Sequence, residues 1–416
     1  MSGKSVPVEH KNKRRPLNLG IDVPFFLAII ALLVFGLLML YSASWEYSVS
    51  IMGQRPSYML ERQVRFLILG GIAATAAFFF DYHRIKKFVI PMMLVTLIML
   101  LLVIFYVNEV RLGARRGLFQ GSIQPSELAK LVVIIYLAFW LNAKKDLLHE
   151  FSFGLLPMAA ILGISSALIL FQPDLSAAAT IFIIGGLMFF MGGGDLKQII
   201  PSLIVALFVG ILLISVYSTG QERISSFIEG IRDPKLASYH MIRSFEAIVR
   251  GGLFGAGIGR ANTKFTGLPV APTDSIFAVI AEETGILGAC VTIILFIFFL
   301  WRGLTIARRA PDMLGRLLAA GITVWIFLEA AINMSVLVNL LPFAGNALPF
   351  ISYGGSSLTM VMIGVGIVMS VARQTAITNN EEERRPLNAV VNLRRDDGRR
   401  GLPRHRRPSS AERSNR

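Results

Sequence analysis

The carboxylate Asp274 stands where a polar segment, LPVAPTD, meets an apolar run that begins at Ser275. Two further carboxylates, Glu282 and Glu283, follow inside the same apolar run. Ionisable residues at membrane depth are costly and are candidates for function. A carboxylate at such a boundary can take a proton from a hydroxyl and act as a general base. Asp274 is therefore the first candidate for catalysis.

A second polar group opens another apolar run, in the segment QPSELAK at residues 124–130. Pro125 suits the first turn of a helix, and Glu127 suits its positive end. Glu127 and Lys130 are three residues apart, so they share a helix face and can form an ion pair. A capped helix with one ion pair and a substrate site inside the membrane both explain this pattern.

Two further segments place polar groups at the start of apolar runs. In QPDLS, helix capping is the leading explanation for Asp174. The segment LPFISYGGSS at residues 348–357, here called the signature segment, mixes glycines and hydroxyls with apolar residues. Its small residues permit close helix approach, and its backbone amides could bind an anion at a helix start. The sequence leaves both roles open.

The apolar runs indicate an all-α integral membrane protein. Of the 416 residues, 54% are hydrophobic, whereas soluble domains have about 45–50%. Runs of about 17–25 apolar residues are long enough to cross a bilayer as helices. The sequence predicts about ten such spans, at residues 22–42, 65–81, 88–107, 126–142, 152–171, 174–192, 200–217, 275–301, 316–340 and 352–373.

The distribution of positive charge predicts the orientation of these spans. Lys and Arg are concentrated in the N-terminal residues 1–20, in the C-terminal residues 374–416, and in the loops at 83–87, 144–145 and 302–316. Cytoplasmic segments carry this excess, so both termini are expected in the cytoplasm. A large extracytoplasmic loop, 218–274, then lies between the seventh and eighth spans. Nucleic-acid binding is the weaker explanation for the net charge of +15.

The same reasoning divides the chain into three parts. Residues 1–20 form a basic cytoplasmic segment, and residues 21–373 form a polytopic membrane domain. Residues 374–416 are rich in Arg, Pro and Asn and poor in apolar residues, so a disordered, basic cytoplasmic tail is expected.

Several arginines lie on the predicted outer side, against the usual charge bias. Arg115 and Arg116 lie in the loop before QPSELAK, and Arg223 and Arg243 lie in the long loop. An anionic substrate on that side would balance them, although pairing with nearby acids is the alternative. In the long loop, residues 241–249 have helical spacing. The glycine-rich run at 251–259 suits close backbone packing, or amides that face a phosphate.

Several of these motifs together resemble one family. GARR, QPSELAK, QPDLS, PTDSIFAVIAEETG and the signature segment occur in order, and the resemblance extends from Tyr41 to Ser357. The chain resembles the shape, elongation, division and sporulation (SEDS) proteins, the group of FtsW, RodA and SpoVE. The resemblance implies a ten-helix peptidoglycan glycosyltransferase that polymerises lipid II outside the cytoplasmic (inner) membrane with a class B penicillin-binding protein. The Tyr-Ser-Ala-Ser motif at 41–44 and the long tail favour an FtsW-like protein over a RodA-like one.

The resemblance also implies roles for individual residues. Asp274 matches the catalytic aspartate, and Glu127 and Lys130 match a polar pair near a central cavity. The remaining substrate-binding candidates are Arg115, Arg116, Arg223, Arg243, Ser352, Tyr353, Gly354, Gly355 and Ser356. Other membrane proteins of division or elongation are expected partners, and nucleic acid is not.

No cofactor follows from the sequence. The chain has one cysteine and no Cys/His spacing typical of a metal site, although a divalent cation, Mg²⁺ or Mn²⁺, could assist a diphosphate reaction. Two other functions remain open at this point. A lipid-substrate flippase would also need polar groups at membrane depth and broken helices, and a non-catalytic division scaffold would need only partner contacts.

Overall fold

The computed structural model describes residues 20–106, 124–172, 174–216 and 218–396, and the regular elements within these ranges are all helices. The chain divides into two units, Met1–Thr375 and Ala376–Arg416. The α-helices are α1 (Val23–Glu46), α2 (Tyr58–Phe79), α3 (Val89–Tyr106), α4 (Pro125–Ala143), α5 (Leu156–Leu170), α6 (Leu175–Met191), α7 (Leu196–Val216), α8 (Ser218–Arg232), α9 (Tyr239–Gly251), α10 (Ile276–Arg309), α11 (Met313–Leu337) and α12 (Gly355–Asp396). Short helical turns are η1 (Tyr47–Ile51), η2 (Tyr82–Lys87), η3 (Lys145–Leu147), η4 (Phe151–Leu155) and η5 (Pro234–Leu236).

Each of the ten predicted spans falls on a helix. Seven helical segments are long and apolar enough to cross a membrane, namely Val23–Ile51, Tyr58–Phe79, Pro125–Ala143, Phe151–Leu170, Ile276–Arg309, Met313–Leu337 and Gly355–Asn379. The chain is therefore a multi-pass membrane protein. Two shorter apolar helices, α3 and α6, and the helix α7 occupy the other expected spans. The count of ten crossings stays a prediction.

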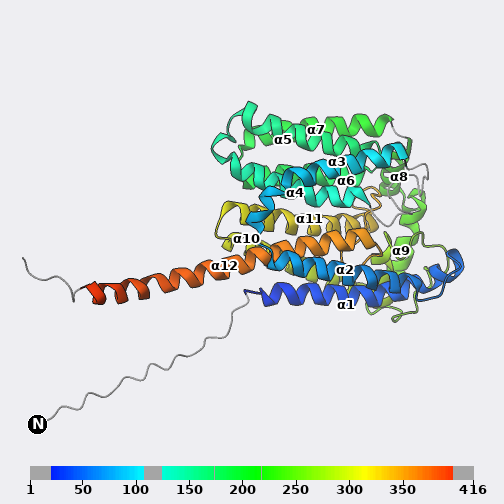
Figure 1. The fold of residues 1–416 in the computed structure, drawn as a ribbon. Helices are drawn as coiled ribbons and strands as arrows, with labels where there is room; N and C mark the ends of the chain where they lie inside the picture. Colours follow the sequence, from blue (N-terminus) through cyan, green and yellow to red (C-terminus); the bar gives the residue numbers. More distant parts are fainter. Residues whose placement is uncertain (1–19, 107–123, 173, 217, 397–416) are drawn as a thin grey trace, which may run out of the picture. The chain divides into compact units, whose positions relative to one another are not determined.

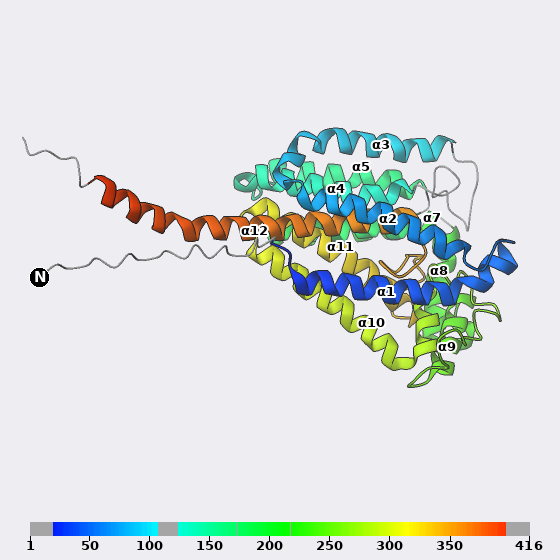
Figure 2. The same ribbon diagram turned by 60° about the horizontal axis from the view of Figure 1, so that its bottom comes forward.

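Contacts between distant residues define the two ends of the helix bundle. At one end Arg302 of α10 binds Asp22, which precedes α1, with nitrogen–oxygen distances of 2.8 Å. At the same end His83 of η2 contacts Asp312 before α11. We call this the His83 end. At the other, the Asp274 end, Gln63 of α2 donates to the carbonyl of Ser352 at 3.0 Å. The long helices run between these two ends (Figures 1 and 2). The helices α8 and α9 lie together at the Asp274 end.

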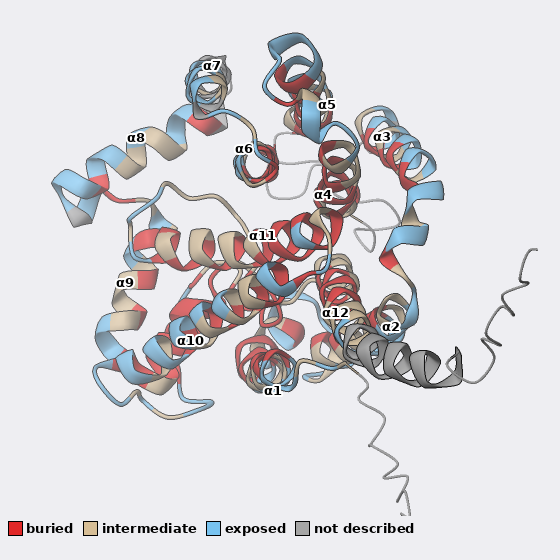
Figure 3. Cartoon of the chain, turned by 90° about the vertical axis from the view of Figure 1, so that its left-hand side faces the viewer, coloured by how far each residue is buried: buried red, intermediate tan, exposed pale blue. Residues whose placement is uncertain are grey.

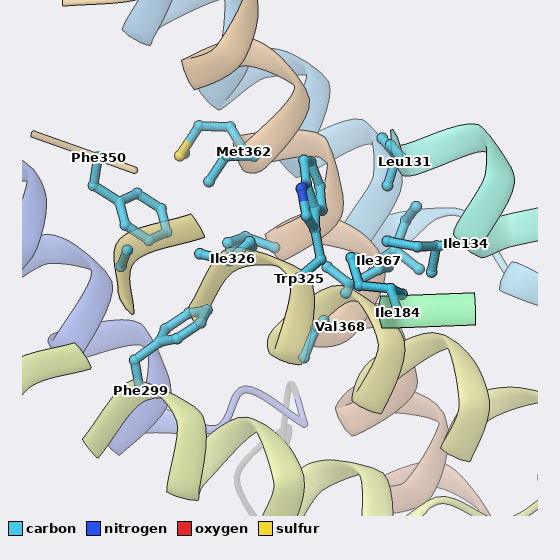
Figure 4. Packing of buried hydrophobic residues seen from close by; sticks show 14 of the residues in the cluster. Leu131, Ile134, Ile184, Phe299, Trp325, Ile326, Phe350, Met362, Ile367 and Val368 are labelled. Carbon is cyan, nitrogen blue, oxygen red and sulfur yellow. The ribbon is translucent and has the colours of Figure 1, made fainter. Parts of the chain in front are cut away.

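Helix α11 lies at the centre of the bundle. It packs against α10, α4 and α6, and most of its residues are buried (Figure 3). Trp325 of α11 is fully buried among Leu131 of α4 and Met362 and Ile367 of α12 (Figure 4). By contrast, α3 exposes large apolar side chains along its length, as a lipid-facing helix does.

The long loop is built on two helices and a glycine-rich run. Helix α9 confirms the helix expected at 241–249. The run that follows lies against a break in α10 at Gly285, whose φ is 71°. There the amides of Ala256 and Gly257 donate to the carbonyls of Glu282 and Glu283 at 2.9 and 3.0 Å. These hydrogen bonds give partners to the carbonyls at the break in the helix. Close backbone packing is therefore the role that the structure gives the glycine-rich run.

The disordered cytoplasmic tail expected from residue 374 stays a prediction. Helix α12 continues through Asp396, and residues 397–416 lie outside the described range.

Candidate functional site

Three consecutive backbone carbonyls fix the segment that carries Asp274. The carbonyl of Pro272 accepts from the amide of Tyr353 at 2.9 Å, and that of Thr273 accepts from the hydroxyl of Ser352 at 2.6 Å. The carbonyl of Asp274 itself accepts from the side-chain amide of Asn333 on α11 at 2.9 Å. Asp274 is partly buried and lies just before α10. The signature segment and α11 therefore place the carboxylate at a defined point of the Asp274 end.

The signature segment is itself held by hydrogen bonds from α2. Gln63 donates to the carbonyl of Ser352 at 3.0 Å and accepts from the amide of Gly354 at 3.2 Å. Gly355 begins α12, and a Cβ atom there would lie 2.3 Å from the ring of Phe66. Ser356 follows in the first turn of α12. Close helix approach, one of the two expected roles of this segment, is thus confirmed, and anion binding stays a prediction.

Backbone strain occurs on both sides of this arrangement. Val270 and Phe350 adopt positive φ values of 48° and 66°, which non-glycine residues seldom do. Val270 lies in the LPVAPTD segment and Phe350 in the signature segment. Strained backbone costs about 1–3 kcal/mol per residue and concentrates at functional sites. The strain supports a functional role for the Asp274 segment.

Lys130 of α4 lies between two carboxylates. It binds Glu127 on its own helix at 2.8 Å, which confirms the predicted pair, and it also binds Glu329 of α11. The ammonium lies 5.8 Å from the ring centre of Trp325. Only 4% of the surface of Lys130 is exposed.

One face of α11 links the two groups of candidate residues. Glu329 and Asn333 are four residues apart, so they point to the same side of the helix. Glu329 contacts Lys130, and Asn333 contacts the Asp274 segment. The structure thereby connects Glu127 and Lys130 with Asp274 and Ser352 through α11, which carries none of the predicted site residues.

Three residues of this arrangement were missed: Glu329, Asn333 and Gln63. Glu329 carries its own signal, since an ionisable residue inside the expected span 316–340 is a functional candidate. Asn333 and Gln63 carry no comparable signal, because their role depends on which distant backbone they contact.

Glu282 and Glu283 stabilise the loop that leads to Asp274. Glu282 accepts from the amides of Asn262 and Thr263 at 2.8 and 3.2 Å. Glu283 accepts from Ser42 of α1 at 2.6 Å and pairs with Lys264 at 2.8 Å. Both carboxylates are buried and hydrogen-bonded, so they anchor the glycine-rich run and the end of α1 to α10.

The predicted cations of the long loop lie in α8 and α9. Arg243 contacts Glu246 at 2.7 Å and the hydroxyl of Tyr239 at 3.2 Å, both on its own helix. Arg223 lies 5.6 Å from the ring centre of Phe343 and lines a cavity of about 180 Å³ with His240. Burial, together with the charge of Arg223, lowers the pKa of His240. Arg243 thus pairs with a nearby acid, which was the alternative to an anionic substrate as its partner.

The remaining predicted residues are a helix cap and two arginines. The carboxylate of Asp174 accepts from the amide of Ala177 at 3.3 Å and from Ser176 at 2.9 Å, which confirms its capping role. Arg115 and Arg116 lie outside the described residues.

The sequence left open a divalent cation that could assist a diphosphate reaction. Within the ranges given above, no group of three or more His, Cys, Asp or Glu side chains lies close enough to hold an ion. Glu127, Glu329 and Lys130 place an ammonium where a cation would bind. The divalent cation stays a prediction.

Three comparisons identify similar proteins. Residues 23–377 match the FtsW, RodA and SpoVE family, described as cell cycle proteins. A probable peptidoglycan glycosyltransferase FtsW of Trichlorobacter lovleyi is 36% identical over 367 residues, which cover 86% of this chain and 95% of that protein. Stage V sporulation protein E of Bacillus subtilis is 35% identical and covers 85% of this chain and 97% of its own length.

Solved structures share the fold. The crystal structure of the rod shape determining protein RodA of Thermus thermophilus matches with a TM-score of 0.64 and 26% identity, over 86% of this chain and 99% of that one. A chain from a peptidoglycan synthase complex, solved to describe how polymerization and crosslinking are coordinated, matches with a TM-score of 0.68 and 25% identity. It covers 85% of this chain and 98% of its own.

Proposed function

The chain belongs to the FtsW, RodA and SpoVE family, and we propose that it polymerises lipid II into peptidoglycan glycan strands with Asp274 as the general base. It is 36% identical to an FtsW protein and 26% identical to a RodA protein, and this difference supports a role in septal rather than lateral wall synthesis. The excess of Lys and Arg in the loops at 83–87, 144–145 and 302–316 supports an orientation with the Asp274 end on the outer face of the cytoplasmic membrane and both termini inside.

The observation that carries this proposal is the way in which the Asp274 segment is held. Carbonyls of Pro272, Thr273 and Asp274 each accept a hydrogen bond from α11 or the signature segment. A general base must lie within hydrogen-bond reach of the proton that it takes. The hydrogen-bonded backbone keeps the Asp274 carboxylate in a constant position. A carboxylate that only contacts lipid headgroups would not need to be held in this way.

In the proposed reaction Asp274 takes the proton from the 4-hydroxyl of the acceptor sugar. The oxygen attacks the anomeric carbon of the growing chain, the bond from that carbon to the diphosphate oxygen breaks, and undecaprenyl diphosphate leaves. Attack from the opposite face inverts the linkage from α to β. Proton transfer of this kind contributes roughly 10²- to 10⁴-fold to the rate.

Cations must face the diphosphate as it gains charge. Lys130 is the candidate within the bundle, and Arg115 and Arg116 precede its helix in the sequence. Arg223 and Arg243 are candidates at the same end. The polyprenyl tails need an apolar groove that opens to lipid. A cavity of about 580 Å³ between α5 and α7, lined mainly by apolar side chains, has suitable chemistry.

The expected partner is a class B penicillin-binding protein, which would crosslink the strands. The similarity to a chain of a complex in which polymerization and crosslinking are coordinated supports this pairing.

The test is glycan synthesis by the purified protein with its class B partner made transpeptidase-dead. Wild type, Asp274→Asn and the control Asp195→Asn, an exposed carboxylate between α6 and α7, are each given labelled lipid II. Long strands from wild type and the control, and none from Asp274→Asn, are expected. An Asp274→Asn protein that polymerises at the wild-type rate contradicts the assignment of the base.

The same variants distinguish glycan synthesis from the two other functions, a flippase and a scaffold. Transport of lipid II across liposomes, with no strands from any protein, would indicate a flippase. A scaffold would tolerate Asp274→Asn in cells, so a dividing strain that carries only this variant would argue against catalysis.

A further inference from the structure

The buried cluster around Lys130 holds two carboxylates against one ammonium. Glu127 binds Lys130 through one carboxylate oxygen, and its other oxygen, Oε2, is buried without a hydrogen-bond partner among the described residues. Glu329 binds the same ammonium from α11. Formally, two carboxylates share one positive charge. The cluster holds Lys130 firmly but leaves it little positive potential for another anion.

A diphosphate that approaches this ammonium meets two carboxylates that already contact it. Lys130 is 4% exposed, and both carboxylates contact it directly. Glu127 lies on the same helix, three residues away, so it moves with Lys130. Glu329 comes from α11, so a small shift between α4 and α11 breaks its contact and keeps the other. Of the two contacts, the one to Glu329 is therefore the one that a shift between helices releases.

We propose that Glu329 is a positioning residue that competes with the diphosphate of the lipid-linked substrate for Lys130. This inference rests on the proposed function for its choice of ligand. Competition weakens the binding of substrate and product alike, and it lets the diphosphate product leave. An interaction that binds ground state and product more tightly lowers KM without raising kcat. Removal of the Glu329 charge therefore tightens binding, and it slows turnover because the diphosphate product is held longer.

The first experiment measures binding alone. Full-length wild type, Glu329→Gln, Lys130→Met and the double variant are purified in detergent and titrated with farnesyl diphosphate, with farnesol as the probe that lacks the anion. Glu329→Gln is expected to bind farnesyl diphosphate about tenfold more tightly, as one freed charged hydrogen bond allows. Farnesol binding should not change. The gain should vanish in the double variant, because it acts through Lys130.

Two outcomes of this titration overturn the inference. One is binding by Glu329→Gln that equals or falls below wild type, and the other is a gain that persists without Lys130. If Glu329→Gln does not fold, Glu329→Asp keeps the charge and withdraws it by one methylene. That variant should bind with an affinity between wild type and the tenfold gain, and wild-type or weaker affinity counts against the proposal.

The second experiment measures the effects of the variant on KM and on kcat separately. In glycan synthesis, Glu329→Gln should lower KM for lipid II and lower kcat, whereas a merely structural residue lowers kcat without lowering KM. Asp22→Asn, which removes a carboxylate from the Arg302 pair at the His83 end, is the control. If wild type makes no strands, the proposed function fails, and the farnesyl diphosphate titration still decides the role of Glu329.

Discussion

The hydroxyl of Ser352 donates a 2.6 Å hydrogen bond to the carbonyl of Thr273, the residue immediately before Asp274. The same hydroxyl accepts from the amide of Leu348 at 2.7 Å. One side chain thus closes the turn of the signature segment and holds the segment of the proposed base. Ser352 can affect the reaction without touching the substrate.

Replacement of Ser352 by Ala should lower both the rate of glycan synthesis and the stability of the fold. Loss of the two hydrogen bonds is expected to cost about 1–3 kcal/mol, and a displaced carboxylate can cost about 10²-fold in rate. Polymerisation assays and thermal unfolding in detergent measure the two effects. Ser165→Ala removes a buried hydroxyl that has no partner in the described structure and should change neither. A wild-type rate for Ser352→Ala would mean that the turn does not position the base.

The buried pair Lys264–Glu283 should be sensitive to the loss of one partner. Lys264→Met leaves the Glu283 carboxylate without its cation, and an uncompensated buried charge costs about 3–5 kcal/mol. Thermal unfolding should show this loss. Lys264→Met/Glu283→Met should recover part of it, because no buried charge remains. Lys145→Met, at an exposed position, serves as control. Equal stability of the single variant and wild type would show that the pair is not buried in the membrane protein.

Two glycine substitutions should have opposite effects on stability. Gly255 has a φ of 83°, and a Cβ atom there would lie 2.2 Å from the carbonyl oxygen of Glu283. Gly255→Ala should therefore destabilise the protein, by about 1–3 kcal/mol from the backbone conformation alone. Gly71 lies within α2 with nothing within 4 Å of an added Cβ, so Gly71→Ala should stabilise it by about 0.5–1 kcal/mol. Equal melting temperatures for the two variants would contradict the docking of the glycine-rich run on α10.

The stability of the His83 end should depend on pH. Partial burial lowers the pKa of His83, but hydrogen bonds and charges from Asp81 and Asp312 outweigh it, and the pKa is raised. A raised pKa in the folded state stabilises the fold fully below the unfolded value of about 6.5. That contribution disappears as pH rises through the raised pKa.

Melting curves in detergent at a series of pH values test this dependence. Wild type should lose melting temperature as pH rises above about 6.5, and His83→Asn should give a flatter profile. Identical profiles for the two proteins would show that the ring does not bridge Asp81 and Asp312.

Much of the fold follows from the sequence because the bilayer sets the length of each helix. Every predicted span coincides with a helix, and the spacing of Glu127 and Lys130 predicted their pair. The contacts of Gln63 and Asn333 could not be predicted, because they depend on packing between distant helices. Glu282 and Glu283 look like intramembrane carboxylates in the sequence, whereas the folded loop surrounds them with donors.

The break in α10 has a consequence for the order in which the chain enters the membrane. An interrupted helix leaves backbone groups unpaired, at several kcal/mol each in lipid. In α10 the carbonyls of Glu282 and Glu283 and the amides of Ile286 and Leu287 bond to the run at 252–257. That run is synthesised before α10, so the ribosome delivers the partner first. Helix α10 can be inserted with its break already satisfied and need not wait for α11 or α12.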